Sequence, residues 1–362
     1  MNILITGASG FIGSFLVEKG IADGHTVWAG IRTTSSLRYL QDSRIRRIEL
    51  DFDNPAHLHK QLVHHQEEHG KWDCIIHAAG ATKCRKPSDF FRTNTDGTRH
   101  FADALCALNM IPSQFIFISS LSIYGPIRET CVAPHAGSVQ PHFAIKGTCA
   151  TGAPLRTSVY APIQGQDSPQ PNTAYGASKY AAEKYLKSIK NFPLVIFRPT
   201  GVYGPRERDY FLMAKSIAGH IDFAAGFKPQ ELTFVYVKDL IEAVFLAIKR
   251  QITGRDYFVS DGQSYNSRAF SDLLQKEMGV SRVLHLKAPL WFLRSVCTVS
   301  GKWAQLTGKT STLNTDKYNI MKQRNWQCDI QPLIAELGYR PEYDLRRGVA
   351  ETVAWYKKEK WL

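Results

Sequence analysis

The chain opens with a strand-like run, Ile3-Leu4-Ile5, which is followed by Thr6-Gly7-Ala8-Ser9-Gly10-Phe11-Ile12-Gly13 and by a helix-like stretch to Ala22. The order of strand, glycine turn and helix is typical of a phosphate-binding turn. Gly7 lets the backbone turn sharply, Gly10 lets it approach a pyrophosphate, and Gly13 lets the helix pack on its strand. Because the helix N-terminus then faces the phosphates, the stretch predicts a dinucleotide-binding turn. An ordinary tight turn is the alternative that the glycines alone leave open.

The 362 residues have an ordinary composition, 44% hydrophobic and 21% charged, which suits one large globular domain or two joined ones. No apolar run is long enough to span a bilayer, and the N-terminus enters a strand without a leader segment. We therefore expect a cytoplasmic protein with no integral membrane segment. The seven cysteines form no Cys-x-x-Cys, which argues against a disulfide framework or a structural zinc.

The formal net charge is +13, and the part from Gly279 onward supplies +7 of it, from 14 Lys and Arg against 7 Asp and Glu. Such a balance suits an anionic cofactor, nucleic acid or an anionic membrane surface, and equally a solvated basic face. Within this part, the stretch around Trp291-Phe292-Leu293 is apolar and is flanked by Lys287, Arg294 and Lys302. It could lie on a membrane surface, but we favour core packing or a lid over an apolar substrate.

Short apolar segments alternate with helix-like ones, which predicts an α/β protein with a Rossmann-type, doubly wound parallel sheet. The predicted strands cover 3–5, 26–30, 47–50, 73–77, 114–119 and 194–198. Helices are expected from Pro87 to about Asn109 and from near Tyr175. We assign 1–200 to a dinucleotide-binding domain and 201–362 to a smaller α/β substrate-binding part with a helical tail, some of whose elements return to the first domain. A Pro-, Gly-, Ser- and Thr-rich stretch, about 126–170, is predicted to be an insertion, a lid or a partly disordered loop.

A tyrosine and a lysine stand four residues apart in Tyr175-Gly176-Ala177-Ser178-Lys179, so a helix places them on one face. A nearby cation lowers the pKa of a tyrosine from about 10, which would let Tyr175 act as a general acid/base on an alcohol or carbonyl. Ser120 ends a predicted strand at the edge where doubly wound sheets bind ligands, and its hydroxyl could polarise a substrate oxygen. A bare helix surface and a serine that caps local backbone are the alternatives.

From Met1 to about Asp261 the chain resembles the extended short-chain dehydrogenase/reductase family, within the NAD-dependent epimerase/dehydratase superfamily. Its tail resembles, more loosely, the 3β-hydroxysteroid dehydrogenase and dihydroflavonol reductase branch. The matching motifs are the glycine turn, Asp51 after the third strand, His77-Ala78-Ala79-Gly80, Asn94-Thr95-Asp96-Gly97-Thr98, Ser119-Ser120-x-x-x-Tyr124-Gly125, Tyr175-x-x-x-Lys179, Arg198-Pro199-x-x-Val202-Tyr203-Gly204-Pro205, Val235-Tyr236-Val237-Lys238-Asp239 and, in the tail, Leu337-Gly338-Tyr339-Arg340-Pro341.

The resemblance implies a Rossmann fold and hydride transfer involving a nicotinamide. It implies that Tyr175 is the acid/base, that Lys179 also holds the nicotinamide ribose, and that Ser120 polarises the substrate oxygen. Asn94 would order a water near the lysine. The residues expected to bind the cofactor are Gly7, Ser9, Gly10, Phe11, Ile12, Gly13, Arg32, Asp51, Phe52, Ala78, Ala79, Gly80, Tyr175, Lys179 and Pro199. The chain departs from the family in that Ser120 and Tyr175 are 55 positions apart (175 − 120), a separation that fits an inserted lid.

The end of the second strand bears on the cofactor. NAD enzymes of this fold usually place an acidic residue there for the ribose 2′-hydroxyl, whereas an arginine accommodates the 2′-phosphate of NADP. Here the strand ends in Gly30-Ile31-Arg32-Thr33-Thr34, without a carboxylate. We therefore expect NADP(H). The alternative is NAD(H), with Arg32 stacked on its adenine.

Two departures bear on the substrate. Dehydratases of the family carry Asp-Glu directly after the serine, where this chain has Leu121-Ser122, so dehydration is disfavoured. Sugar-nucleotide enzymes tend to place an arginine before the Val-x-Val-x-Asp segment to clamp the diphosphate, where this chain has Glu231-Leu232-Thr233-Phe234. We therefore predict an NADP(H)-dependent oxidoreductase that interconverts a ketone and a secondary alcohol on a lipophilic molecule, sterol-like or polyphenol-like.

Two other functions stay open. The first is a nucleotide-sugar epimerase or dehydratase with tightly bound NAD(P), for which Arg206, Arg208 and Lys228 are candidate diphosphate ligands. The second is a non-catalytic NAD(P)-binding regulator. We expect a small-molecule substrate, no nucleic acid and at most peripheral membrane contact, and a homodimer stays open. His65 and His69 have a spacing that can bind a metal, but we interpret them as part of a solvated helix face and assign no metal ligand.

Overall fold

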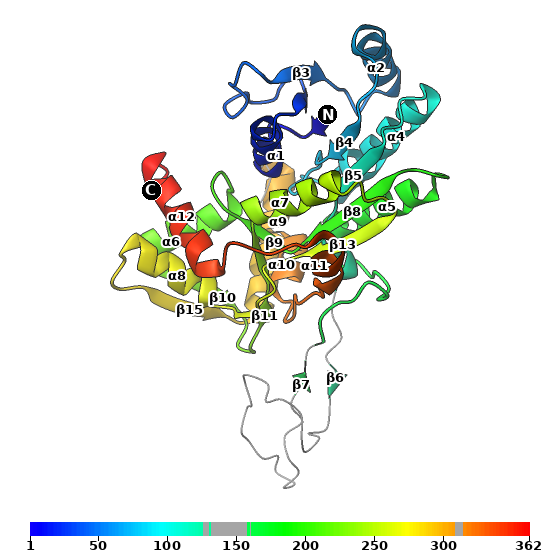
Figure 1. Ribbon diagram of the computed structural model, residues 1–362. Helices are drawn as coiled ribbons and strands as arrows, with labels where there is room; N and C mark the ends of the chain where they lie inside the picture. Colours follow the sequence, from blue (N-terminus) through cyan, green and yellow to red (C-terminus); the bar gives the residue numbers. More distant parts are fainter. Residues whose placement is uncertain (126–129, 132–157, 160, 308–313) are drawn as a thin grey trace.

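The computed structural model describes residues 1–125, 130–131, 158–159, 161–307 and 314–362 (Figure 1). At its centre is a seven-stranded sheet in the order β13-β8-β5-β4-β1-β2-β3, with every neighbouring pair parallel. This confirms the predicted parallel, doubly wound sheet. The strands are Asn2–Thr6 (β1), Thr26–Ile31 (β2), Arg46–Glu49 (β3), Cys74–His77 (β4), Gln114–Ile118 (β5), Leu194–Pro199 (β8) and Arg255–Val259 (β13).

The strand order reverses between β1 and β4. From β1 the chain moves outward through β2 and β3, then returns to β4 and moves the other way through β5, β8 and β13. In open parallel sheets, ligands bind outside the carboxyl ends of the strands at such a reversal. The glycine turn that follows β1 lies at this position.

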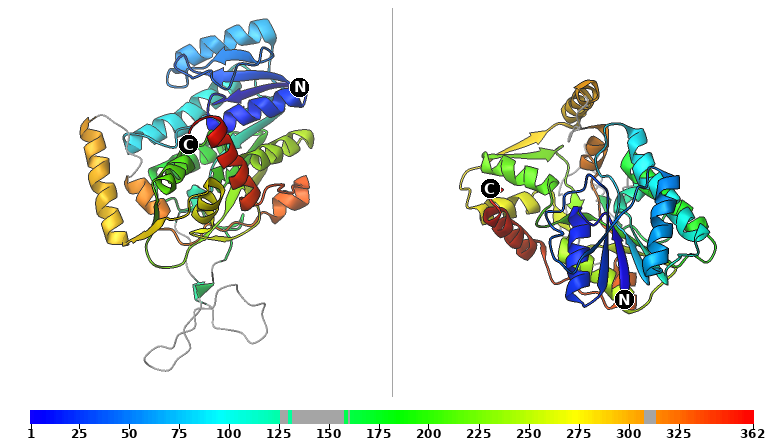
Figure 2. Two further views of the ribbon diagram at one scale, coloured as in Figure 1. Left: turned by 90° about the vertical axis from the view of Figure 1, so that its left-hand side faces the viewer. Right: turned by 90° about the horizontal axis from the view of Figure 1, so that it is seen from above.

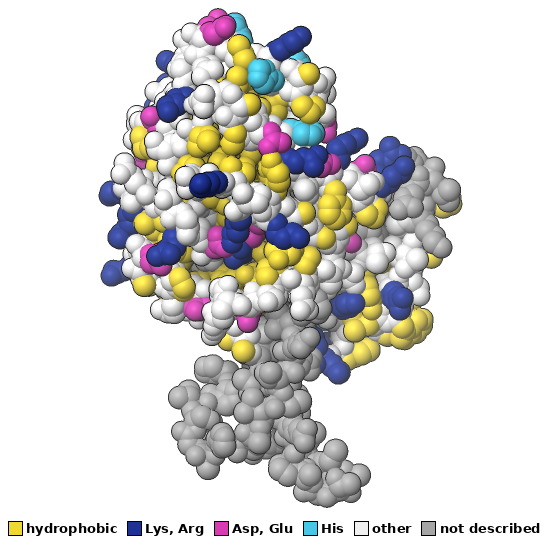
Figure 3. Space-filling view, turned by 90° about the vertical axis from the view of Figure 1, so that its right-hand side faces the viewer, with side chains coloured by type: hydrophobic (Ala, Val, Ile, Leu, Met, Phe, Trp, Pro, Cys, Tyr) yellow, Lys and Arg dark blue, Asp and Glu magenta, His cyan; other side chains and the backbone are white. Residues whose placement is uncertain are grey.

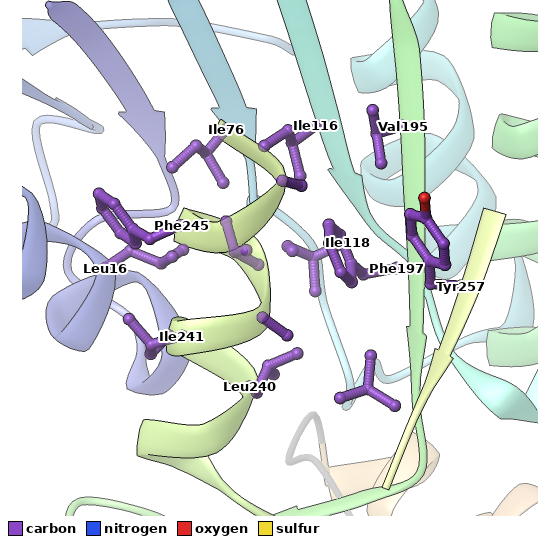
Figure 4. Close-up of a cluster of buried hydrophobic side chains, with 14 of the residues drawn as sticks. Leu16, Ile76, Ile116, Ile118, Val195, Phe197, Leu240, Ile241, Phe245 and Tyr257 are labelled. Atoms are coloured by element: carbon purple, nitrogen blue, oxygen red, sulfur yellow. The ribbon is translucent and has the colours of Figure 1, made fainter. Parts of the chain in front are cut away.

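Helices cover both faces of the sheet. One face carries α1 (Phe11–Ala22), α7 (Val237–Lys249) and α11 (Gln331–Leu337), and the other carries α2 (Pro55–His69), α4 (Gly97–Ala107) and α5 (Ala174–Ser188). Because successive strand residues point to opposite faces, Ile3 and Ile5 join the first core while Leu4 joins the second. In the first core, Leu240, Ile241 and Phe245 of α7 lie against α1 and the strands (Figure 4). Each such side chain contributes about 1.5–3 kcal/mol when fully buried.

The helix predicted from Pro87 to about Asn109 is interrupted. It consists of α3 (Pro87–Phe90), a π-helical segment (Phe91–Asp96) and α4. A π-helical turn carries an extra residue per turn and often occurs at functional sites. Here the segment contains Asn94, one of the expected site residues, whose side chain is fully buried.

A second group of elements packs beyond the sheet around Tyr203, Phe234 and Tyr236. Its helices are α6 (Asp209–Ala218), α8 (Ala269–Met278) and α12 (Leu345–Lys358). Short strands pair around it, namely β9 (Gly201–Tyr203) with β12 (Phe234–Tyr236), β10 (Ile221–Ala225) with β15 (Leu284–Ala288), and β11 (Glu231–Leu232) with β14 (Tyr265–Asn266). Two more helices, α9 (Leu290–Thr307) and α10 (Thr315–Met321), follow β15.

The structure bears on the predicted insertion at about 126–170 and on the apolar stretch around Trp291. In the predicted insertion, β6 (Thr130–Cys131) pairs with β7 (Ser158–Val159), and residues 126–129, 132–157 and 160 lie outside the described residues. Of the two settings expected for the apolar stretch around Trp291, core packing is wrong, because Trp291 in α9 is 71% exposed. A lid over the substrate stays a prediction. None of the helices that the structure describes combines the length and apolar character needed to cross a bilayer.

The turn between β1 and α1 leaves no room for side chains at two of its glycines. Gly7 has a φ of +67°, and a Cβ placed on it would lie 2.8 Å from the backbone of Ala78 and Ala79 after β4. A Cβ on Gly13 would lie 2.1 Å from the Gly7 carbonyl oxygen. The close packing of α1 on the turn therefore requires glycine at both positions.

We predict that Gly13→Ala lowers the free energy of unfolding by about 3 kcal/mol or more, because the added methyl group meets backbone that cannot move aside. Urea unfolding followed by circular dichroism measures this. Gly165→Ala is the matched control, because nothing lies within 4 Å of its added Cβ, and it should change stability by less than about 1 kcal/mol. Equal effects of the two substitutions would contradict the packing argument.

Candidate active site

The carboxyl edge of the sheet brings several expected site residues together. Ala78 and Ala79 lie against the glycine turn, as the clash distances at Gly7 show. A Cβ on Gly80 would lie 3.0 Å from Asn94 Oδ1 and 3.1 Å from Lys179 Nζ. The segment after β4 therefore packs directly against the glycine turn at one end and against Asn94 and Lys179 at the other.

The buried side chain of His77 bridges elements at this edge of the sheet by hydrogen bonds. His77 Nδ1 is 2.8 Å from Thr6 Oγ1, and its Nε2 is 3.0 Å from Thr98 Oγ1. Burial lowers the pKa of His77 to about 3, with a smaller effect of the Lys179 charge in the same direction. The imidazole is therefore neutral at physiological pH, and it links β1, β4 and α4 through hydrogen bonds.

The Asn94 amide forms hydrogen bonds on both of its sides. Its Oδ1 accepts from the Ala81 backbone N–H (2.7 Å), and its Nδ2 donates to the Ala81 carbonyl (3.1 Å) and to Ser178 Oγ (2.9 Å). Asn94 thus fixes the segment after β4 against α5, the helix that carries Tyr175 and Lys179. The water-ordering role that the family resemblance implies stays a prediction.

The helix that carries the tyrosine and lysine begins at a defined cap. Thr173 Oγ1 accepts the Gly176 backbone N–H at 2.9 Å, as expected for an N-cap threonine. One turn on, Lys179 is 4% exposed, and its Nζ donates to the Ile118 carbonyl oxygen at 2.9 Å. Burial lowers the pKa of Lys179 to about 8. The end of β5 therefore holds a buried amine that titrates close to physiological pH.

Ser120 lies beside Tyr175, despite the long separation in sequence. Burial raises the pKa of the Tyr175 hydroxyl, and a hydrogen bond with the Ser120 side chain partly offsets this. Ser120 Oγ is also 2.5 Å from Ser122 Oγ. The expectation that Lys179 lowers the pKa of Tyr175 is wrong for this structure, because burial has the largest effect and the ammonium is bonded to Ile118.

The expected adenine-side residues lie at the ends of β2 and β3. Arg32 directly follows β2, is exposed, and its backbone N–H bonds Ser35 Oγ at 3.0 Å. Asp51 Oδ2 is 3.3 Å from His57 Nδ1, and the Phe52 ring packs edge-on against Phe101. At the opposite side of the site, Pro199 ends β8 and is buried.

Two neighbours of Tyr175 were not predicted from the sequence. Asp316 Oδ2, at the start of α10, accepts the Tyr175 backbone N–H at 3.1 Å. The Phe90 ring lies edge-to-face with the Tyr175 ring at 6.1 Å. Asp316 is 141 residues away in sequence and belongs to no motif, so no local signal could have found it.

A buried ion pair holds α5 on the sheet and was also not predicted. Arg198 Nη2 in β8 contacts Glu183 Oε2 of α5 at 2.6 Å and Asp256 Oδ2 of β13 at 2.8 Å. The Arg198 and Glu183 side chains are 5% and 2% exposed. Removal of one partner would leave a buried charge unpaired, which typically costs about 3–5 kcal/mol. Arg198 lies in a motif matched to the family, but only the structure shows its partners.

Of the three cations proposed for a diphosphate, Arg206 is engaged elsewhere. Its Nη1 donates to Ser14 Oγ (2.9 Å) and its Nη2 to Glu18 Oε1 (2.5 Å), both in α1. The guanidinium also lies 4.3 Å from the Phe15 ring centroid. Arg208 and Lys228 are exposed. Arg206 therefore acts in the contact between its own turn and α1.

Of the two histidines at metal-binding spacing in α2, His69 lies on the expected solvated face and His65 does not. His65 is 3% exposed and stacks on the Trp72 ring at 4.0 Å, so it is part of the core rather than of a solvated face. Burial lowers its pKa to about 4. Within the described ranges no group of three or more His, Cys, Asp and Glu side chains is arranged to hold a metal ion.

The buried amine predicts a pH-dependent stability. Between about pH 8 and 10.5 the unfolded chain keeps the Lys179 proton that the folded chain has lost, so the Lys179 contribution to the free energy of unfolding rises with pH. The difference between wild type and Lys179→Met should therefore grow in favour of wild type from pH 7 to pH 10, by about 3 kcal/mol at most. Urea unfolding with reductant measures it. Lys184→Met, at an exposed position of α5, is the control, and an equal pH trend there would refute the assignment.

Comparisons with known proteins agree with this geometry. The chain is 25% identical to the UDP-glucose 4-epimerase of Vibrio cholerae, over 97% of this chain and 94% of the relative. It is 22% identical to the ceramide reductase of Caulobacter vibrioides, over 99% and 96%. The structure of dTDP-glucose 4,6-dehydratase from Bacillus anthracis in complex with NAD superposes with a TM-score of 0.71 and 18% identity, covering 100% of this chain and 98% of that one.

The relatives fit the nucleotide-sugar alternative better than a sterol-like or polyphenol-like substrate, since most of them act on nucleotide sugars. Similar solved structures are in complex with NAD. They do not show the preference for NADP that the sequence predicts. The model of the NAD dependent epimerase/dehydratase family matches residues 3–260. With that match over most of its length, the chain belongs to the NAD-dependent epimerase/dehydratase family and is an enzyme of the extended short-chain dehydrogenase/reductase type.

Proposed function

We propose that the enzyme transfers a hydride between a nicotinamide and a carbon that alternates between secondary alcohol and ketone, with Tyr175 as the group that exchanges the hydroxyl proton. The observation that carries this is the convergence of Ser120, Tyr175 and Lys179 at one edge of the sheet. A dinucleotide suits the same edge, because the glycine turn and the N-terminus of α1 follow β1 at the carboxyl edge, where the strand order reverses. The cofactor would supply the hydride acceptor or donor.

Three residues would have separate roles in proton transfer, substrate orientation and cofactor binding. In the oxidation direction the Tyr175 oxygen accepts the proton of the substrate hydroxyl, and in reduction it returns a proton to the carbonyl oxygen. The Ser120 hydroxyl, already bonded to Tyr175, would orient the substrate oxygen. Lys179, whose pKa of about 8 keeps it mostly protonated at pH 7, would hold the nicotinamide ribose. Leu121 and Ser122 are both buried and carry no carboxyl group, which supports hydride transfer without elimination of water.

Tyr175→Phe should lower turnover by about 10²–10⁴-fold, because the ring remains while its proton is removed. Cofactor affinity, measured by fluorescence titration, should change little. Tyr185→Phe is the control on the same helix, since its hydroxyl bonds Asp103 away from the site. Full turnover by Tyr175→Phe would end the proposal that Tyr175 is the acid/base.

For the cofactor, we propose a preference for NADP(H). The support is the exposed Arg32 directly after β2, at the position where a 2′-phosphate would lie. Arg38, the next arginine along the chain, instead pairs with Glu359 at 2.8 Å. The two arginines therefore offer a matched comparison.

Arg32→Ala should weaken NADPH binding by about 10- to 100-fold, the effect of losing a hydrogen bond to a charged group, and leave NADH binding nearly unchanged. Calorimetric titration gives both constants. Arg38→Ala should preserve the ratio of the two. Tighter binding of NADH than NADPH by the wild-type protein would contradict the preference.

The substrate class has two candidates. We place a nucleotide sugar first, with 4-epimerase chemistry, because most relatives act on such substrates and dehydration lacks its carboxyl groups here. The second candidate is a lipophilic ketone or alcohol. It is favoured by the engagement of Arg206 with α1, by the lack of a cation at Leu232-Thr233, and by the ceramide reductase relative.

The two candidates differ in what happens to the cofactor. Epimerisation returns the cofactor to its starting state, whereas ketone reduction consumes one NADPH per product. Incubation with UDP- and dTDP-hexoses should give the 4-epimer without net change at 340 nm, the absorbance of reduced nicotinamide. NADPH consumption with ceramide-like or sterol ketones, and no change of the sugars, would select the second candidate. Inertness toward both classes, with retained cofactor binding, would favour the regulator alternative.

A further inference from the structure

The region of β15 and α9 exposes apolar side chains in a positively charged setting. Residues 278–315 contain five Lys and Arg (Arg282, Lys287, Arg294, Lys302 and Lys309) and no Asp or Glu. Arg282, Lys287 and Arg294 are exposed. A stretch with this composition attracts anionic surfaces.

The two-stranded sheet of β10 and β15 presents an apolar face to solvent. Because β10 and β15 pair in parallel, with Phe223 beside Leu286 and Ile221 beside Leu284, these four side chains share one face. They are 36–61% exposed. The other face is anchored, since buried Asp222 accepts a hydrogen bond from Ser271 Oγ of α8 and contacts His285 Nδ1, both at 3.0 Å.

Helix α9 continues this apolar surface. Of its described side chains only Leu293 and Cys297, one turn apart, are buried. Val299 follows Trp291 by eight residues and Trp303 follows Val299 by four, so the three side chains lie toward one side of the helix. They are 71% (Trp291), 68% (Val299) and 69% (Trp303) exposed. Phe292 and, before the helix, Phe227 are also exposed (50% and 66%). A Cβ on Gly226 would lie 3.3 Å from the Leu290 side chain, so the loop after β10 adjoins the start of α9.

The views show where this surface lies on the molecule. In both panels of Figure 2, α9 is at the periphery of the molecule rather than between its layers. At the corresponding right-hand edge of Figure 3, hydrophobic side chains gather together with Lys and Arg side chains. An apolar surface of this kind in a folded protein usually marks an interaction site.

We propose that the apolar surface formed by β10, β15 and α9 docks on an anionic phospholipid membrane. Tryptophan and phenylalanine beside lysine and arginine are the combination that inserts at the boundary of headgroups and acyl chains. A second copy of the chain is a poorer occupant, because a two-fold interface would bring the same acid-free, basic stretch against itself. The proposal is independent of the substrate, because it uses no residue of the proposed active site.

Flotation with phosphatidylcholine vesicles, with and without phosphatidylglycerol, tests the docking. The wild-type protein should float with phosphatidylglycerol vesicles and be released by salt. Trp291→Ser/Trp303→Ser should lower the partition coefficient by at least about tenfold, while Trp291→Phe/Trp303→Phe should retain most of it. Cofactor affinity and circular dichroism of each variant verify that it is folded.

Charge variants test whether binding depends on the basic residues of this surface, and light scattering tests whether the surface instead joins two protein molecules. Lys287→Glu/Arg294→Glu should lower binding to phosphatidylglycerol vesicles by at least about tenfold, at about 1 kcal/mol per basic residue. Lys249→Glu, at an exposed position of α7, should not. Absence of wild-type binding would overturn the proposal. So would a vesicle-independent oligomer, detected by light scattering, that Trp291→Ser/Trp303→Ser dissociates, because the surface would then be a protein interface.

Discussion

The contact between the glycine turn and the segment after β4 is the constraint on which the site depends. A Cβ on Gly13 would meet the Gly7 carbonyl oxygen at 2.1 Å, and a Cβ on Gly7 would meet Ala78 and Ala79 at 2.8 Å. Because no side chains lie between them, the backbone of the glycine turn packs directly against α1 and against the segment after β4. The same segment continues through Gly80 to Asn94 and Lys179. The position of the amine that faces the expected nicotinamide end therefore follows from packing that begins at the first strand.

The site is held by buried polar groups as well as by packing. Asn94 joins the segment after β4 to α5, and Arg198 joins α5 to β8 and β13 through Glu183 and Asp256. Lys179 adds a buried amine whose desolvation lowers its pKa to about 8. Burying such groups costs free energy unless they are paired, and these have partners. The site therefore combines a rigid support with one group that changes charge near neutral pH.

Local sequence patterns predicted six of the seven strands of the sheet and the glycine turn, because alternation of apolar strands and helices and the need for glycine act over a few residues. The seventh strand, β13, lies in the part assigned to substrate binding, and its place in the sheet depends on tertiary packing. Tyr175 and Lys179 could be paired because four residues make one helical turn. Asp316 and the partners of Arg206 could not be predicted, since they depend on how distant segments pack. The expectation that the stretch around Trp291 packs in the core was wrong for a related reason. An apolar helix face has the same sequence pattern whether it packs in a core or is exposed to solvent. Only the tertiary structure, in which α9 lies beside β10 and β15, shows that this face is exposed.

The central claim is that one dinucleotide spans the glycine turn and the Ser120–Tyr175–Lys179 group. A crystal structure with bound NADP⁺ measures this most directly. We expect the pyrophosphate over Gly7 to Gly13, the ribose within hydrogen-bond reach of Lys179, and the nicotinamide ring beside Tyr175 and Pro199. A dinucleotide bound elsewhere on the protein, or one whose nicotinamide end lies away from Tyr175, would contradict the account.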